Sequence, residues 1–287
     1  MSGSAGSRQR VGHQLLRIEF TTRAFIIFCA ILFGLDALFL LGSFQALSDQ
    51  ATAPLLGQYR HLVFFIKRHL DLTTEGVVAT WYSSALLLLA GLVALTNIRI
   101  DGVSAWLKWL NRVGWLLLGL VLIALSADEI AQIHESLGPL LNSMEYPPRH
   151  VIGPGDWIPI LLPFIVATAV FMIAFFLLVV RKSLVALALS LAGVGCWVGA
   201  ILSESIEAGF WKADVSRQWR GTVEEGFEVI GTSLLLVGFI QFHRRSLTAT
   251  QCVAITEEPA QEAERPIEGS PSLDTTSTDD VREKISG

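Results

Sequence analysis

Residues 113–136 read VGWLLLGLVLIALSADEIAQIHES, and this stretch decides the fold. Its first fifteen residues carry no charge, and Asp128, Glu129, His134 and Glu135 follow within nine positions. A continuous apolar run is typical of a membrane-spanning helix, whereas a strand of a membrane barrel alternates. Because crossing the hydrocarbon takes about 20 residues, we expect the acidic end of this helix to lie within the membrane.

The composition supports a membrane protein. Of the 287 residues, 52% are hydrophobic and only 16% are charged, and the mean hydropathy is +0.54. The net charge of −5 is concentrated in the last forty or so residues, and no basic footprint for nucleic acid is present. The three cysteines have no sensible pairing, so we expect neither a disulfide framework nor a thiolate zinc site.

The whole chain predicts an all-α polytopic bundle of about six transmembrane helices. The expected spans are 24–47, 76–97, 113–134, 157–180, 183–204 and 223–242. A basic segment, 1–23, precedes the transmembrane domain of 24–245, and an acidic tail, 246–287, has the composition of a disordered segment. Within the domain, apolar positions in residues 55–70 recur at helical spacing and predict an amphipathic helix on the outer membrane surface.

The distribution of Lys and Arg predicts the orientation of the chain in a cell membrane. With the N-terminus inside, the inner segments carry eleven of these residues and the outer segments carry seven. Since positive charge is retained on the cytoplasmic side, we expect both termini to be cytoplasmic. In this topology membrane lipids are the expected partners.

Carboxylates from four predicted helices then meet on the outer side. The uncharged run of the sixth span, 229–242, is also short, so its acidic start is drawn toward the membrane. The acidic residues gathered in this way are Glu75, Asp128, Glu129, Glu204, Glu207, Glu224, Glu225 and Glu228. Burying so many carboxylates is costly unless they are paired, protonated or bound to metal.

Simpler roles exist for part of this set. Glu75 at a helix start complements the helix dipole, and Glu225 has capping-box spacing from Thr222. Capping cannot explain the acids at helix C-termini, where the dipole disfavours negative charge, but simple solvation of those ends can.

Helical phase sorts the residues around Asp128. In a regular helix Asp128, Gln132 and Glu135 share one face, and His134 lies about 120° from Asp128. His134 can therefore join Asp128 only if the helix unwinds, or it acts as a base or hydrogen-bonding partner.

Asp36 is a separate candidate because it lies in the middle of the first span, in FGLDALFL. An acid there is costly unless it faces the bundle interior. Residues 81–84 of the second span, Trp-Tyr-Ser-Ser, could supply hydrogen-bond donors to it. The sequence leaves open whether Asp36 is a structural anchor or part of a proton path.

Three segments together resemble a group of uncharacterised bacterial multi-pass membrane proteins. These segments are DLTTEGVVATWYSSALLLL (71–89), LSADEIAQIHE (125–135) and VEEGFEVIGTSLLL (223–236). The resemblance implies a bacterial inner-membrane location and a shared role for the acidic residues and His134. It implies no established activity.

Three functions fit the pattern. In the first, Asp128, Glu129, Glu224 and Glu228 hold a divalent metal, and His134 or Glu135 acts as general base in an enzyme acting on a lipid or another amphiphile. In the second, the carboxylates bind protons or cations in a transporter. In the third, the acidic rim pairs with outer Arg and Lys residues in a structural membrane subunit.

Overall fold

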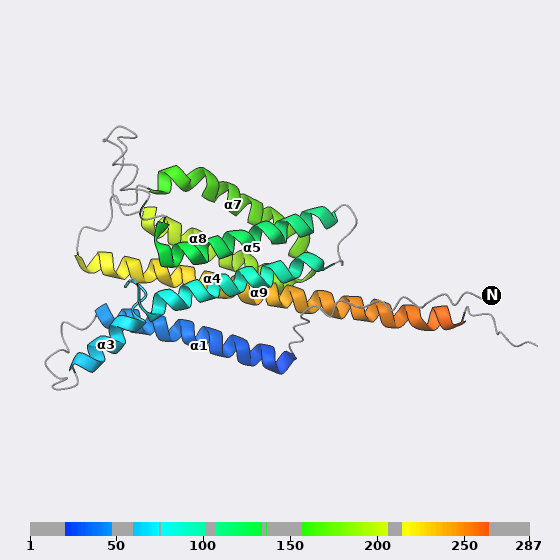
Figure 1. The fold of residues 1–287 in the computed structure, drawn as a ribbon, viewed down its shortest axis with the longest axis horizontal. Coiled ribbons are helices and arrows are strands. Elements are labelled where there is room, and N and C mark those ends of the chain that lie inside the picture. The colour runs from blue at the N-terminus through cyan, green and yellow to red at the C-terminus, as the bar shows by residue number, and fades with distance from the viewer. Residues whose placement is uncertain are drawn as a thin grey trace, which may run out of the picture. The chain divides into compact units, whose positions relative to one another are not determined.

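The computed structural model describes residues 21–47, 60–74, 76–100, 107–133, 136, 157–205 and 214–263. Within these ranges every regular element is a helix (Figure 1). In chain order these are α1 (Thr22–Leu47), α3 (Arg60–Leu70), α4 (Val78–Thr96), η2 (Asn97–Arg99), α5 (Leu107–Ala131), α7 (Trp157–Val179), η3 (Val180–Lys182), α8 (Leu184–Ser205) and α9 (Asp214–Ala263). The predicted all-α polytopic bundle is therefore confirmed.

Five helices of the described chain, α1, α4, α5, α7 and α8, are long and apolar enough to cross a membrane. Their many lipid-accessible Leu, Ile, Val and Phe side chains are exposed on the bundle surface. The end at which α1 finishes and α4 begins is called here the α3 end. The opposite end carries η2 and η3.

The sixth predicted span, 223–242, lies inside α9, which is not among these five helices. Its apolar residues from Val229 to Phe242 are largely buried within the bundle. A central helix is covered by protein rather than by lipid, so it tolerates charges at its start that an outer span would not. The capping role expected for Thr222 is also wrong, because α9 begins at Asp214 and Thr222 is buried inside the helix.

Small residues bring α4 and α5 into close contact. A Cβ atom added to Gly119 would lie 3.0 Å from the carbonyl oxygen of Gly91, and the reverse addition gives the same distance. Nearer the α3 end, the hydroxyls of Ser84 and Ser126 lie 2.9 Å apart, and each also lies 2.8 Å from the other residue's carbonyl oxygen. Small and hydroxylated residues of this kind are the usual packing surface between helices in a membrane, where the lipid is as apolar as the helices.

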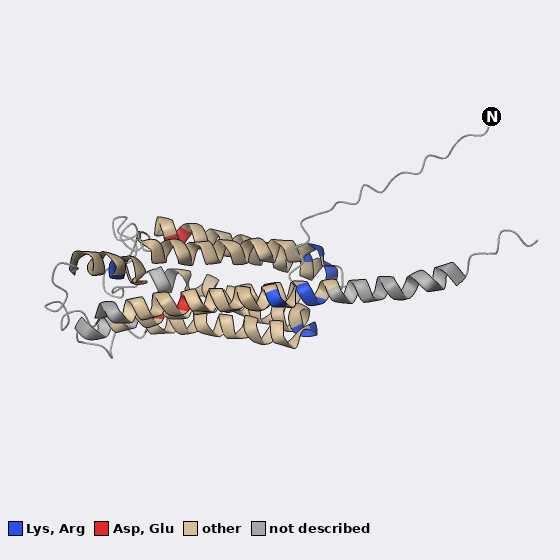
Figure 2. Ribbon diagram, turned by 90° about the horizontal axis from the view of Figure 1, so that it is seen from below, with Lys and Arg blue, Asp and Glu red and all other residues tan. Residues whose placement is uncertain are grey.

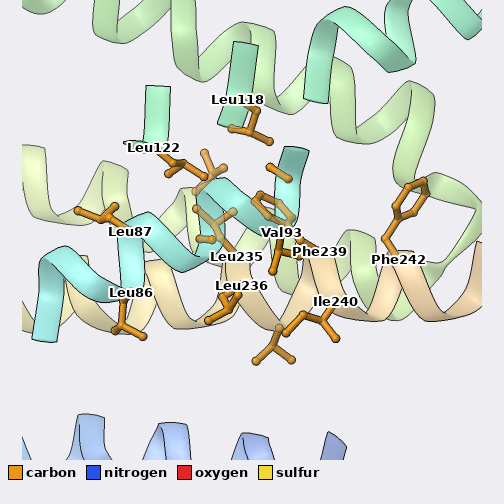
Figure 3. Close-up of a cluster of buried hydrophobic side chains, with 14 of the residues drawn as sticks. Leu86, Leu87, Val93, Leu118, Leu122, Leu235, Leu236, Phe239, Ile240 and Phe242 are labelled. Atoms are coloured by element: carbon orange, nitrogen blue, oxygen red, sulfur yellow. The ribbon is translucent and has the colours of Figure 1, made fainter. Parts of the chain in front are cut away.

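Leucines and aromatic rings fill the space between α4, α5 and α9 (Figure 3). The largest buried side chain is Trp115 on α5, which is 0% exposed. Its ring centroid lies 5.2 Å from that of Phe175, 5.1 Å from that of Phe239 and 5.3 Å from that of Phe242. The indole nitrogen donates to Oδ1 of Asn111 at 3.1 Å, so this large side chain is packed and hydrogen-bonded at once.

A polar contact fixes α9 to η2 at the end opposite α3. The Asn97 amide nitrogen donates to the Phe239 carbonyl oxygen at 3.3 Å, which turns Oδ1 of Asn97 toward Nδ1 of His243, 2.9 Å away. Nδ1 is therefore the protonated nitrogen of a neutral imidazole. His243 lies just past the predicted span, and burial lowers its pKa.

We expect stability to fall in mild acid because of His243. The unfolded chain binds the imidazole proton near the usual pKa of 6.5, and the folded chain binds it only at lower pH. The free energy of unfolding is therefore highest above about pH 6.5 and decreases as the pH falls through the lowered pKa. Detergent-induced unfolding at a series of pH values checks this. In His243→Gln the decrease should be smaller, and an unchanged decrease would contradict the assignment.

Helix α9 continues to Ala263, so the segment from 246 that the sequence predicts to be disordered is helical over its first part. Residues 247–263 are rich in Ala, Gln and Glu, which favour helix. The described residues up to Leu247 form one compact unit, and those from Thr248 to Ala263 belong to a second.

Candidate functional site

The most unusual polar group of the described chain is Asp36 on α1, which is only 2% exposed. It lies 14 residues after the start of α1 and 8 residues before Phe44, so about 21 Å and 12 Å of helix separate it from the two ends of that span. A carboxyl group at this depth is out of reach of bulk water and of the lipid headgroups.

One carboxylate oxygen of Asp36 is satisfied by α4. The Tyr82 hydroxyl donates to Oδ1 at 2.5 Å and also lies 3.3 Å from the Leu32 carbonyl oxygen. The Tyr82 ring stacks on Phe39, with centroids 4.6 Å apart. The donor expected from residues 81–84 is therefore Tyr82, and the phenol is held firmly in place by its neighbours on α1.

The second carboxylate oxygen, Oδ2, is buried and makes no hydrogen bond within the described chain. Ser233 of α9 is fully buried and lies near both Asp36 and Tyr82. Its hydroxyl likewise makes no hydrogen bond there. Among the described residues no Lys, Arg or His pairs with Asp36. Two buried polar atoms from different helices, Oδ2 of Asp36 and Oγ of Ser233, are thus left without a hydrogen bond among the described residues.

The acids expected on the outer side lie toward the α3 end (Figure 2). Asp128 and Glu129 are partly buried near the end of α5, and Glu224, Glu225 and Glu228 are partly buried in α9. Each of these five side chains has an interaction partner. Glu204 lies in the last turn of α8.

Helix α5 ends at Ala131, and Gln132 adopts a left-handed backbone conformation with φ of 52°. The face predicted to unite Asp128, Gln132 and Glu135 is therefore not continued, because the helix breaks before Glu135. A positive φ is uncommon for a residue other than glycine and often marks a functional segment.

The described residues do not bring three His, Cys, Asp or Glu side chains close enough together to hold a metal ion. The four predicted ligands Asp128, Glu129, Glu224 and Glu228 thus form no such group by themselves. Glu75, His134, Glu135 and Glu207 lie outside the described residues, as does the side chain of Glu204. A metal centre that includes any of them stays a prediction.

Asp36 is recognisable as a candidate from the sequence, whereas Ser233 is not. A lone serine in the apolar run GTSLLLVG carries no local signal, because its meaning depends on α9 lying against α1 and α4.

The fold and this pair define a class: a polytopic helical membrane protein in which a buried carboxyl group is hydrogen-bonded to a partly buried phenol within the spans. A family described as a domain of unknown function (DUF8692) matches residues 23–242, and the chain belongs to this family. No curated protein and no solved structure matches the chain.

Proposed function

We propose that the protein is a proton- or cation-coupled membrane transporter in which Asp36 binds the coupling ion. The observation that supports this is the carboxyl group of Asp36, buried within a span, with Tyr82 on Oδ1 and an unsatisfied Oδ2. An ionisable residue inside a membrane span is costly, and such residues usually mark ion pathways or proton relays.

The chemistry follows from the charge. A bare carboxylate in the bundle interior costs several kcal/mol, and a single neutral donor such as Tyr82 offsets only part of that cost. A proton on Oδ2 removes the charge and supplies a donor that can reach Ser233. Release of this proton requires access to water from one side, which a shift of α1 against α4 and α9 would open.

For the orientation we propose that the α3 end faces away from the cytoplasm. Arg244 and Arg245 of α9 and the basic residues of the short helices η2 and η3 lie at the opposite end of the bundle (Figure 2). Since cytoplasmic segments retain positive charge, this end is cytoplasmic, and so are the two termini.

Proton binding and proton movement test the proposal separately. Infrared difference spectra of the purified protein should contain the carbonyl band of a protonated aspartic acid. Proteoliposomes loaded with a pH-sensitive dye should show flux under an imposed gradient. If the carbonyl band is absent across the accessible pH range, Asp36 carries no exchangeable proton and the proton-coupled form of the proposal fails.

A second candidate is the metal-dependent enzyme expected from the sequence, and the break at Gln132 favours it. Because α5 stops at Ala131, the backbone at Gln132 no longer follows the regular rotation of that helix. The expected 120° separation of His134 from Asp128 assumes a regular helix, and that regularity ends at Gln132.

For this candidate we expect about one or two divalent ions per chain in the purified protein. Elemental analysis of the wild type and of well-folded Asp128→Asn and Glu228→Gln variants checks this, with loss of metal expected in both variants. Glu225→Gln is the matched control on the same turn of α9. A metal-free wild type after purification with added metal would exclude a tight metal site.

A further inference from the structure

Helix α3 offers a surface that the proposed transport site does not use. It has 11 residues, from Arg60 to Leu70, and is about 16 Å long, so it is too short to cross a membrane. Figure 1 shows it running at an angle to α1 beyond the point where α1 and α4 meet. We propose that α3 lies in the membrane interface and binds anionic phospholipid headgroups.

The helix is fixed to the bundle rather than loosely tethered. The backbone amide of Leu72 donates to Oγ of Ser43 at 2.7 Å, in a buried contact. A Cβ atom on Gly42 would lie 2.6 Å from Cβ of Leu70, so the end of α3 rests directly on the backbone of α1. After the helix, the Asp71 carboxylate accepts hydrogen bonds from Thr73 and sets the turn into α4. The angle of α3 to the spans is therefore determined by the fold.

One face of α3 is apolar and uncovered. Leu62, Phe65 and Ile66 are spaced three and four residues apart, so they share a face. Their side chains are 57%, 59% and 48% exposed. On a helix at the level of the headgroups, such a face is buried in the acyl boundary and supplies most of the binding free energy.

The basic residues of α3 give the surface its charge preference. Lys67, Arg68 and His69 occupy the last turn, and Arg68 is exposed. In Figure 2 the Lys and Arg of α3 stand apart from those at the opposite end of the bundle. A basic residue near a membrane surface favours anionic lipid by about fivefold. An uncovered apolar face beside the exposed Arg68 and the partly exposed Lys67 therefore matches an acyl chain joined to a phosphate headgroup.

A fluorescent reporter placed on α3 tests the inference. Phe65→Trp is reconstituted in bilayers containing equal fractions of brominated phosphatidylglycerol or brominated phosphatidylcholine, and the emission of the otherwise identical wild type is subtracted. We expect phosphatidylglycerol to quench this emission several-fold more strongly. Adding Lys67→Gln and Arg68→Gln should bring the ratio close to one, whereas adding Arg181→Gln and Lys182→Gln at the opposite end should leave it unchanged.

Two results would overturn the inference. Equal quenching by both lipids with Lys67 and Arg68 intact would remove the preference for anionic headgroups. Quenching by neither lipid would show that α3 stands away from the bilayer and presents its apolar face to protein. Both results are independent of Asp36, so this inference and the transport proposal can fail separately.

Discussion

Asp36→Asn should abolish proton movement by the protein and leave its fold intact. Asparagine keeps an acceptor for the Tyr82 hydroxyl, which lies 2.5 Å from Oδ1, and its amide group adds a donor toward Ser233. The side chain can no longer take up or release a proton. We expect proton flux in proteoliposomes to fall by about a hundredfold or more, the range seen when a proton-transferring side chain is lost. The protonated carbonyl band should disappear in parallel.

A purely structural role for Asp36 predicts a different proton flux for the Asp36→Asn variant. If Asp36 only joins α1 to α4, asparagine preserves the joint and flux is retained, which would defeat the transport proposal. Size-exclusion profiles and thermal unfolding verify that the variant is folded. Asp71→Asn is the matched control, because it alters the same chemical group at the α3–α4 corner while keeping an acceptor for Thr73. Its flux should equal that of the wild type.

The spans were predictable because lipid imposes a simple requirement. A helix that faces the acyl chains must be apolar over most of its length, and α1, α4, α5, α7 and α8 all satisfy this locally. α9 departs from the rule because it is covered by its neighbours, and no local pattern distinguishes a central helix from a short span.

The candidate site was predictable only in part. Asp36 was recognisable because neither capping nor solvation explains an acid in the middle of an apolar run. The second span offered few hydrogen-bond donors to it, and Tyr82 is the one that it uses. Ser233 could not be assigned because it comes from a helix almost 200 residues further along the chain. The contact of Asn97 with His243, 146 residues apart, was invisible for the same reason.

Trp115→Ala should be the most destabilising single truncation in the bundle. The indole is 0% exposed and contacts the rings of Phe175, Phe239 and Phe242 on two other helices. Its removal leaves a large cavity and takes the hydrogen-bond donor from Oδ1 of Asn111. Because α7 and α9 meet α5 at this ring, the cavity cannot close without moving a helix. We expect the free energy of unfolding to fall by about 3–5 kcal/mol.

Trp109→Ala is the matched control for this prediction. Trp109 lies on the same helix, but it is 71% exposed, so its truncation removes few packed contacts and should change stability by less than about 0.5 kcal/mol. Reversible unfolding in mixed micelles measures both variants against the wild type. In a membrane the helices gain little from leaving water, so tight packing around one ring carries an unusual share of their association. Equal losses in the two variants would mean that this ring does not hold α5, α7 and α9 together.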